Sequence, residues 1–297
     1  MSIFNKKNYL AAVSGGPDSI ALLHMYRKHI KVVCTVKYNK RTDCAYDVEC
    51  VEKLCSKYKI PLKILDVTED IYRKYEFDSN FQSQARRIRY DFFVETAKKY
   101  NIEKILIAHH LDDFLETSYS QFQSNSKNLF YGIKERSKYK DLEIYRPFIN
   151  RFRKTTLQRY CKDFNLDYAI DSTNTDTKYE RNKIRQIISN MDRDSIYNLL
   201  KKVKNYNSNN KKKIKQINNQ FQQWESSNFE IKLFKTFNQD EQYYLIYNFL
   251  QKFEIYRPNR NKINGIIEFI IGMNGKEYRI DNGFKIVKVH GLLKIIN

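Results

Sequence analysis

A six-residue segment near the N-terminus constrains the fold more than any other part of this sequence. It consists of Ser14, Gly15, Gly16, Pro17, Asp18 and Ser19. It follows the apolar run Leu10–Val13, which is typical of a buried strand, and it leads into apolar residues up to Met25 that predict a helix. Glycine lets the backbone approach a ligand closely, and a helix start presents unpaired N–H groups. The segment therefore predicts a nucleotide-phosphate site between a strand and a helix.

The glycine pattern narrows the kind of phosphate site. It contains neither the G-x-x-x-x-G-K-[ST] pattern nor the G-x-G-x-x-G pattern. The order S-G-G-x-D-S resembles the pyrophosphate loop (PP-loop) of the family that includes GMP synthetases, asparagine synthetases and several tRNA-modifying enzymes. That resemblance implies cleavage of ATP between its α and β phosphates and adenylation of a substrate. The plainer alternative is an ordinary glycine turn between a strand and a helix.

Strands and helices are expected to alternate in the first part of the chain. The predicted strands are Asn8–Val13, Lys31–Tyr38, Leu62–Val67 and Lys104–Ala108. The predicted helices between them are Asp18–His29, Ala45–Lys59 and Phe81–Tyr100. This alternation predicts an α/β fold in which helices cover both faces of a parallel sheet. Ligands bind beyond the carboxyl ends of such strands, so Ser14–Ser19 and His109-His110 are expected to converge there.

The character of the sequence changes near Asp192. Apolar residues between Ile196 and Trp224 recur at steps of three and four on a background rich in Lys and Asn. This spacing predicts amphipathic helices, with an interruption at Asn207–Asn210, and two further helices follow at Glu241–Phe253 and Asn261–Ile271. Short strands are expected at Glu277–Val289 and Leu292–Ile296, with Asn282-Gly283 as a hairpin turn. We expect a catalytic domain at 1–190 and a smaller, mostly helical domain at 191–297.

Charge is the strongest signal in the composition. The 297 residues contain 54 Lys and Arg against 34 Asp and Glu, a formal net charge of +20. Such an excess favours a polyanionic partner, nucleic acid before a membrane surface, although drift in an AT-rich coding sequence would produce a similar bias. No segment has the length and hydropathy of a membrane span. The five cysteines form no C-x-x-C pair, which disfavours a zinc or iron–sulfur site and fits free thiols in the cytoplasm.

A second group of polar residues follows the fourth predicted strand. It contains His109, His110, Asp112, Asp113 and Glu116. On a helix, Asp112 and Glu116 lie one turn apart on one face and Asp113 lies close by, so the three carboxylates repel each other unless a cation is present. Mg²⁺ with a triphosphate, or a substrate ammonium group, would supply that cation. Plain capping of the helix start by acidic residues is the alternative.

Two basic segments complete the candidate site. Arg86 and Arg89 lie on one face of the helix predicted at Phe81–Tyr100, and arginine is suited to bidentate phosphate contacts. A solvated basic face explains them equally well. Further along, a polar loop is expected at Asp171–Asn174, and it precedes Arg181, Asn182 and Arg185. If this second segment is helical, its two arginines share one face. That face could contact a phosphate or a base edge.

Together these motifs resemble the tRNA(Ile)-lysidine synthetase family of bacteria. The match lies between residues 8 and 190 and consists of Ser14–Ser19, Gln84–Tyr90, His109–Thr117, Arg146-Pro147, Asp171–Asn174 and Arg181–Arg185. The resemblance implies an AMP-forming ligase that joins lysine to C2 of the wobble cytidine in tRNA(Ile) with a CAU anticodon, through an adenylated cytidine. Codon reading would thereby change from AUG to AUA.

The resemblance also implies roles for individual residues. Ser14–Ser19 would hold the ATP phosphates, and Asp18, His109, Asp112, Asp113 and Glu116 would form the catalytic group. Asp112 and Asp113 become candidates for Mg²⁺. Arg86, Arg89, Arg181, Asn182 and Arg185 become candidates for tRNA or lysine contacts. ATP, Mg²⁺, L-lysine and tRNA(Ile) are the expected ligands, and a homodimer is a further expectation.

The sequence departs from the family pattern after the second predicted strand. The family has a histidine-bearing stretch ending in an arginine there, whereas this chain has Lys37 and Lys40 with Asn39 and Arg41 nearby, which leaves the roles of the two lysines open. Two other functions stay in view. A PP-loop tRNA thiolase would need cysteine pairs that Cys44, Cys50 and Cys55 do not provide, and a non-enzymatic RNA-binding relative would explain the charge but not His109–Glu116.

Overall fold

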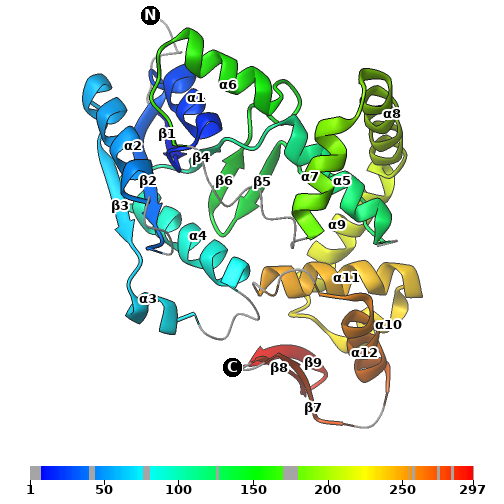
Figure 1. The fold of residues 1–297 in the computed structure, drawn as a ribbon. Coiled ribbons are helices and arrows are strands. Elements are labelled where there is room, and N and C mark those ends of the chain that lie inside the picture. The colour runs from blue at the N-terminus through cyan, green and yellow to red at the C-terminus, as the bar shows by residue number, and fades with distance from the viewer. Residues whose placement is uncertain are drawn as a thin grey trace, which may run out of the picture. The chain divides into compact units, whose positions relative to one another are not determined.

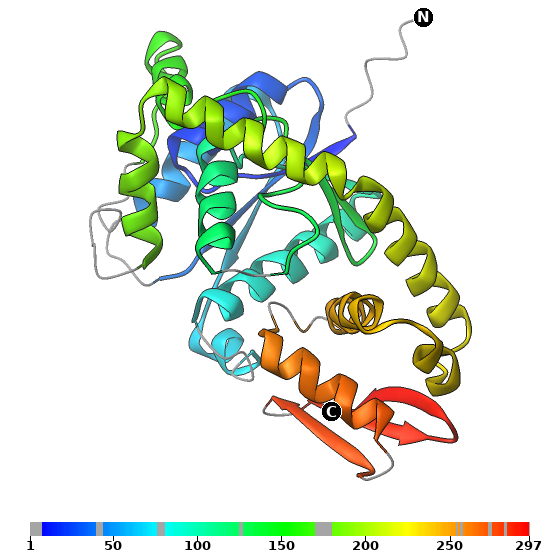
Figure 2. The ribbon, with the colours of Figure 1, turned by 90° about the vertical axis from the view of Figure 1, so that its right-hand side faces the viewer.

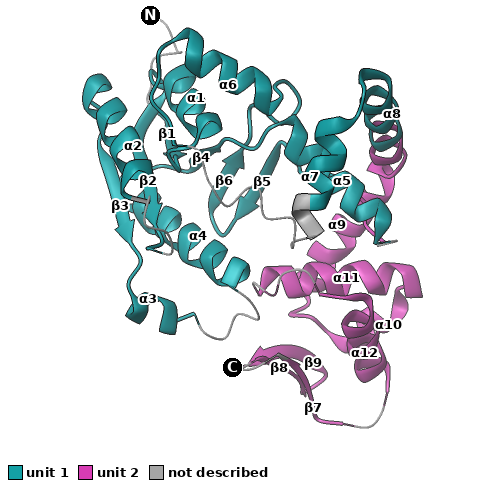
Figure 3. Ribbon diagram, viewed as in Figure 1, with its two compact units in different colours: residues 1–125, 131–203 teal, residues 126–130, 204–297 magenta. Residues whose placement is uncertain are grey.

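The computed structural model describes residues 8–39, 44–75, 81–124, 127–169, 180–253, 255, 258–272, 275–281 and 284–296, without the side chains of residues 44, 180–182 and 281. The chain divides into two compact units (Figure 3). The first comprises Met1–Asn125 and Tyr131–Val203, and the second comprises Ser126–Phe130 and Lys204–Asn297.

A six-stranded sheet forms the centre of the first unit (Figure 1). Its strands are β1 (Tyr9–Ala12), β2 (Ile30–Lys37), β3 (Leu62–Asp66), β4 (Lys104–Ile107), β5 (Arg136–Tyr139) and β6 (Leu142–Tyr145), in the order β3-β2-β1-β4-β6-β5. All neighbours pair in parallel except β5, which runs antiparallel to β6. The predicted α/β fold and its four parallel strands are confirmed, and the β5–β6 hairpin was not predicted.

Eight helices belong wholly or partly to this unit in the described ranges. They are α1 (Pro17–Tyr26), α2 (Cys44–Tyr58), α3 (Glu69–Arg73), α4 (Phe81–Lys99), α5 (Leu111–Gln123), α6 (Lys154–Asp163), α7 (Glu180–Asn190) and α8 (Arg193–Asn209). The helices predicted after β1, β2 and β3 correspond to α1, α2 and α4. The short α3 and α6 were not predicted.

Helices cover both faces of the sheet because consecutive strand residues point to opposite sides. In β1, Ala11 packs into a core with residues of α1, α2 and α6. The preceding Leu10 packs into a separate core with residues of α4. Leu106 and Ile105 of β4 divide between the two cores in the same way. The sheet is therefore buried on both faces, and its ligand-accessible positions lie at the strand ends.

The second unit is built from helices and a small sheet. Its helices are α9 (Lys211–Ser226), α10 (Ile231–Thr236), α11 (Gln239–Lys252) and α12 (Arg260–Ile271), and its strands are β7 (Glu277–Asp281), β8 (Phe284–Val289) and β9 (Leu292–Ile296). The strands pair antiparallel beside α12 (Figure 2). Trp224 is fully buried at the centre of the core, and its indole N–H donates to the carbonyl of Glu230 at 3.1 Å.

Most of the C-terminal prediction is confirmed. The break between α8 and α9 lies at Asn210, where the polar Asn207–Asn210 stretch predicted it. The turn predicted at Asn282-Gly283 lies outside the described residues. The two units divide between Val203 and Lys204, within α8, whereas the sequence predicted a boundary at 190. None of the helices in the described ranges combines the length and hydropathy that a membrane span needs.

A buried histidine joins α1 to α6 on one face of the sheet. The Nδ1 atom of His24 lies 2.7 Å from the hydroxyl of Tyr160, and its ring packs near Tyr58 and Phe164. Burial lowers the pKa of His24 below its ordinary value of 6.5, and the charges of Arg27 and Lys57 lower it further. The folded protein therefore favours the neutral imidazole.

This histidine predicts a pH dependence of stability. Above the unfolded pKa of 6.5, His24 is neutral in both states. As the pH falls from about 7 to about 5, the unfolded chain binds a proton that the folded chain resists, so stability is lost. We expect His24→Gln to lose less free energy of unfolding over this interval than the wild type, as measured by urea unfolding at each pH. His29→Gln, outside this cluster, should follow the wild type. An equal loss in His24→Gln would contradict the prediction.

Candidate active site

The glycine segment connects β1 to α1 in a conformation that its own sequence fixes. Gly15 has a φ of 87°, and a Cβ atom there would lie 2.4 Å from the carbonyl oxygen of Asp47, so only glycine fits. Gly16 is the N-cap of α1 and Pro17 occupies its first turn. The Ser19 hydroxyl accepts a hydrogen bond from the Ser14 N–H at 3.1 Å and donates to the Gly16 carbonyl at 2.9 Å. These hydrogen bonds hold the loop in one fixed conformation at the start of α1.

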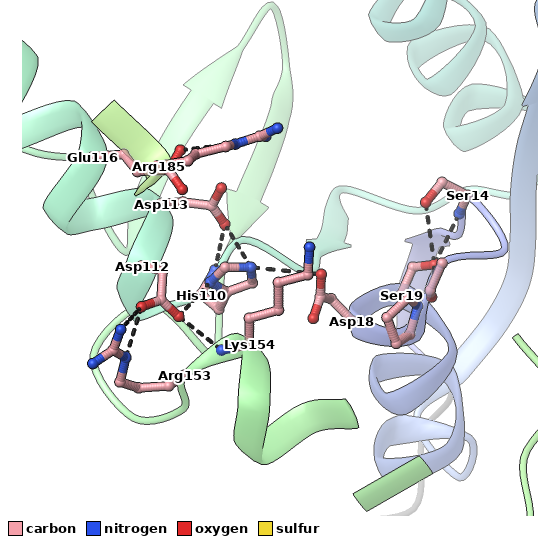
Figure 4. Close-up of polar contacts among 12 residues, drawn as sticks. Ser14, Asp18, Ser19, His110, Asp112, Asp113, Glu116, Arg153, Lys154 and Arg185 are labelled. Atoms are coloured by element: carbon pink, nitrogen blue, oxygen red, sulfur yellow. Dashed lines mark hydrogen bonds and ion pairs between the residues drawn. The ribbon is translucent and has the colours of Figure 1, made fainter. Parts of the chain in front are cut away.

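The ends of β1 and β4 bring two distant segments together, as predicted (Figure 4). The Nε2 atom of His110, which follows β4, lies 3.5 Å from Oδ2 of Asp18 and 3.5 Å from Oδ2 of Asp113. Its Nδ1 atom lies 3.5 Å from Oδ2 of Asp112. One buried imidazole therefore links the loop after β1 to the first turn of α5.

Each carboxylate of α5 has a hydrogen-bond or ion-pair partner from the protein itself. Asp113 accepts a hydrogen bond from the backbone N–H of His110 at 2.9 Å, which caps the helix. A carboxylate oxygen of Glu116 lies 3.3 Å from Nε of Arg185 on α7. Asp112 pairs with Arg153. Capping and charge pairing together explain how three acidic residues share one turn, so their proximity alone does not require a bound cation.

Asp112 is the most completely bonded of these acids. Its Oδ1 atom accepts from Nε of Arg153 at 2.7 Å and lies 2.6 Å from Nη2 of the same residue. Its Oδ2 atom accepts from the backbone N–H of Lys154 at 2.7 Å. Both oxygens are therefore engaged in fixing the start of α6. The role of Asp112 as a Mg²⁺ ligand stays a prediction, and both of its carboxylate oxygens already have protein partners.

Asp18 shows the opposite situation. Its Oδ1 atom is buried without a hydrogen-bond partner in the described part of the structure, and its Oδ2 atom faces His110. Within the described ranges, no group of three His, Cys, Asp or Glu residues has the arrangement to hold a metal ion. Mg²⁺ is usually held by one or two carboxylates together with substrate phosphates and water. Asp18, with Asp113 beside the same imidazole, fits that mode of binding.

The two adjacent histidines have different electrostatic surroundings. Desolvation lowers the pKa of His109, and the charge of Arg146 adds to this although Asp113 opposes it. The Nε atom of Arg146 donates to Nδ1 of His109 at 3.0 Å, so the neutral ring carries its proton on Nε2. Burial also acts to lower the pKa of His110, but Asp18, Asp113 and Asp112 together raise it above its ordinary value. His109 is suited to donate a hydrogen bond, and His110 to carry a positive charge.

A cavity of about 660 Å³ opens between these elements. The glycine loop forms one wall, and the starts of α5 and α6 and part of α7 form the others. One side is apolar and aromatic, and its lining residues are Cys34, Val36, Tyr38, Tyr90 and Phe93. The remaining lining combines charged side chains of α5, α6 and α7 with small and polar residues, among them those of the glycine loop. The cavity therefore offers an apolar wall for a flat ring beside polar walls for phosphates.

The predicted basic residues separate into three groups. Arg89 and Arg185 line the cavity. Arg86 does not line it, because its guanidinium lies over the Tyr90 ring at 4.4 Å from the ring centroid. The structure does not describe the side chains of Arg181 and Asn182. The polar loop Asp171–Asn174 lies wholly outside the described residues. The segment leading to Asp171 is nevertheless tied to the glycine loop, since the Ala169 N–H donates to the Gly15 carbonyl at 3.0 Å.

Of the two lysines that replace the expected histidines, the structure describes only Lys37. Lys37 lies 3.4 Å from Asp66 at the sheet surface and is absent from the cavity lining. Lys40 lies outside the described residues. Asn39 adopts a φ of 55° and donates to the Val67 carbonyl at 3.3 Å. Tyr38 is the residue of this stretch that faces the cavity, and its hydroxyl donates to the Ala85 carbonyl at 3.0 Å.

The sequence pattern did not predict α6, and although Arg146-Pro147 belongs to the family match, no role was predicted for Arg146. Arg153 and Lys154 line the cavity at the start of α6, and Arg146 is only 4 % exposed beside His109. A local signal for α6 was present in the sequence. Two basic residues at a helix start oppose the helix dipole, so they indicate a nearby anion.

Comparison with known proteins agrees with this geometry. Residues 2–191 match the family model of a PP-loop domain. The chain is 43 % identical over 298 residues to a tRNA(Ile)-lysidine synthase of Ureaplasma parvum, covering 99 % of this chain and 89 % of that protein. It is 40 % identical to a tRNA(Ile)-lysidine synthase of Malacoplasma penetrans, and the match covers 95 % of this chain and 97 % of that protein.

A solved structure also shares the fold. The U34-tRNA thiolase NcsA from Methanococcus maripaludis, solved with its [4Fe–4S] cluster, has a TM-score of 0.55 and 18 % identity, covering 70 % of this chain and 73 % of that one. At this identity the similarity concerns the fold alone. The four described cysteine side chains, Cys34, Cys50, Cys55 and Cys161, are free and buried.

The two glycines of the loop make a matched pair for a stability test. We expect Gly15→Ala to lower the free energy of unfolding by about 2 kcal/mol, because it combines a clash with a strained positive φ. Gly16→Ala should have little effect on stability, since its Cβ would lie no closer than 3.8 Å to Ser14 and its φ is −72°. Thermal unfolding of both variants measures the difference. Equal stability of the two would contradict the close contact at Gly15.

Proposed function

This chain belongs to the tRNA(Ile)-lysidine synthase family, and we propose how its cavity carries out the family's reaction. The enzyme is an AMP-forming ligase that uses ATP to form lysidine on tRNA(Ile). The observation that carries this function is the full-length similarity to lysidine synthases, combined with a cavity that unites the PP-loop and the first turn of α5. The use of free lysine, the metal and the roles of individual residues are proposals.

The reaction has two steps that must take place at one site. In the first, O2 of the wobble cytidine attacks the α-phosphorus of ATP, the bond from that phosphorus to the bridging oxygen breaks, and pyrophosphate leaves with the electron pair. In the second, the lysine ε-amine attacks C2, the C2–O2 bond breaks, and AMP leaves carrying that oxygen. The amine loses a proton in this step. Both steps depend mainly on positioning and on stabilising the leaving groups.

The cavity offers matching places for the parts of ATP. The loop Ser14–Ser19 and the N-terminus of α1 suit the phosphates, because their N–H groups and the helix dipole favour negative charge. The apolar wall formed by Val36, Tyr38 and Phe93 suits the adenine ring. The α-phosphorus would then lie near the Asp18–His110 contact.

Mg²⁺ fits at the polar side of the same cavity. Its ligands would be the unpartnered Oδ1 of Asp18 and a carboxylate oxygen of Asp113, completed by phosphate oxygens. When bound, it would supply charge neutralisation to the triphosphate. His110 lies against both carboxylates and holds them in place.

The substrate lysine would meet the pair formed by Glu116 and Arg185. The amino-acid end of lysine is a zwitterion, and this pair presents a carboxylate and a guanidinium 3.3 Å apart at the cavity wall. An α-ammonium group would replace Arg185 as the partner of Glu116, and the α-carboxylate would take the freed guanidinium. Neutral His109 donates from Nε2 to substrate in the same cavity.

The net charge of +20 supports tRNA as the macromolecular substrate. The thiolase alternative finds no support in the described part, where no three potential ligands converge for a cluster. Homodimer formation and a cytoplasmic location remain predictions from the sequence.

The function is tested by incubating the full chain with ATP, labelled lysine and a tRNA(Ile) transcript that carries a CAU anticodon. Incorporation of label into the tRNA, with one AMP and one pyrophosphate released per lysidine, is the expected result. AMP release that depends on a sulfur donor, without lysine incorporation, would overturn it.

Asp18 provides a sharper test of the proposed chemistry. We expect Asp18→Ala to lower the rate of adenylation by at least about 10²-fold, because removing one group that organises transition-state charge typically costs that much. The affinity for tRNA should change little. AMP formation in single-turnover assays and filter binding of labelled tRNA measure the two effects separately. A large loss of tRNA affinity would place the loop in RNA binding instead.

The basic surface predicts a strong salt dependence. If the protein neutralises several phosphates, its affinity for tRNA should fall by about 10³-fold or more between about 50 mM and about 200 mM salt. The double variant Lys212→Ala/Lys215→Ala removes two exposed charges from α9. If both contact the tRNA backbone, it should reduce the slope of log K against log salt by about two. A flat response of the wild type would mean that the charge reflects composition only.

A further inference from the structure

The start of α6 carries more positive charge than a helix start normally tolerates. Arg153 is its N-cap and Lys154 its first residue, and no acidic residue occupies the first turn. The helix dipole adds further positive charge at the same end. Positive charge at this end of a helix is mildly unfavourable, and nearby anions offset that cost.

The protein itself balances one of the two side chains. Asp112 accepts from the Arg153 guanidinium at 2.7 Å and from the Lys154 backbone N–H at 2.7 Å. The carboxylate is buried, and it anchors the first turn of α6 against the first turn of α5. This contact fixes the position from which the Lys154 side chain extends.

The ammonium group of Lys154 has no such counterion. It makes no ion pair or hydrogen bond with any residue in the described ranges, although the residue lines the cavity. Two other cations that line the cavity, Arg153 and Arg185, are each paired with a carboxylate. In Figure 4 the Lys154 side chain extends from the start of α6 toward the side chain of Asp18, and both residues line the cavity. Lys154 is exposed and lines the cavity, so its ammonium group is available to a negatively charged ligand that enters there.

We propose that Lys154 is a catalytic residue of the adenylation step, whose ammonium group binds the β- and γ-phosphates of ATP opposite the loop Ser14–Ser19. When the bond between the α-phosphorus and the bridging oxygen breaks, that oxygen gains the electron pair and the pyrophosphate gains charge. The ammonium group stabilises this charge without giving up its proton. The inference rests on the proposed function, since it assumes an AMP-forming reaction in this cavity.

The triphosphate fits this place better than the other ligands do. The side chain of the substrate lysine ends in an ammonium group in solution, which Lys154 would repel. Its carboxylate has a guanidinium partner available in Arg185. Pyrophosphate is the most highly charged group in the reaction, and its charge increases in the transition state, where a fixed cation has its largest effect.

The test compares Lys154→Met with Lys162→Met, which removes an exposed lysine from the last turn of the same helix. Full-length protein is assayed for single-turnover AMP formation on tRNA(Ile), for inhibition by added pyrophosphate and for thermal unfolding. We expect Lys154→Met to slow adenylation by about 10²- to 10³-fold and to weaken pyrophosphate inhibition by at least about tenfold. Lys162→Met should match the wild type, and Lys154→Arg should recover part of both losses.

Two results would overturn the inference. One is wild-type adenylation and wild-type pyrophosphate inhibition in Lys154→Met. The other is a defect confined to lysine incorporation, which would place Lys154 at the amine. If Lys154→Met does not fold, Lys154→Gln takes its place in the same assays. Direct binding of pyrophosphate to the wild type and the variant separates this inference from the proposed function, because it does not require lysidine formation.

Discussion

Parallel pairing of β1 with β4 is the constraint on which the active site depends. The pairing runs from Tyr9 opposite Lys104 to Ala12 opposite Ile107, so both strands end at the same level. The loop after β1 and the His109-His110 pair after β4 therefore share one edge of the sheet. The contact of His110 with Asp18 and Asp113 follows from this register. If the pairing of β1 with β4 shifted by one residue, the residues of one strand would turn to the other face of the sheet, and the two segments would no longer meet.

Around that edge, the protein neutralises some charges internally and leaves others for ligands. Asp112 is engaged by Arg153 and the start of α6, and Glu116 is paired with Arg185. Oδ1 of Asp18 and the ammonium of Lys154 lack partners in the described part of the structure. An unpaired carboxylate oxygen and an unpaired ammonium are what a metal–triphosphate complex requires, since it presents both positive and negative charge. Under the proposed function, this division separates residues that position others from residues that would contact the ligands.

The sequence predicted the parallel strands and the loop because both depend on local patterns. Apolar runs such as Leu10–Val13 mark buried strands, and Gly15 occupies a position where no other residue fits. The contact between Arg153 and Asp112 escaped prediction because the two residues are 41 positions apart in the chain. The role of Arg146 escaped for the same reason, since its contact with His109 spans 37 positions.

By itself, the sequence determined the α/β fold, the phosphate loop, and the candidate group from His109 to Glu116, since these follow from periodicity and from glycine geometry. The tertiary structure decided which member of that group does what. Asp112 and Asp113 are adjacent acids with the same chemistry, yet one anchors α6 and the other faces His110 beside Asp18. Only packing determines which partner reaches each oxygen, because a carboxylate's role depends on neighbours that come from distant parts of the chain.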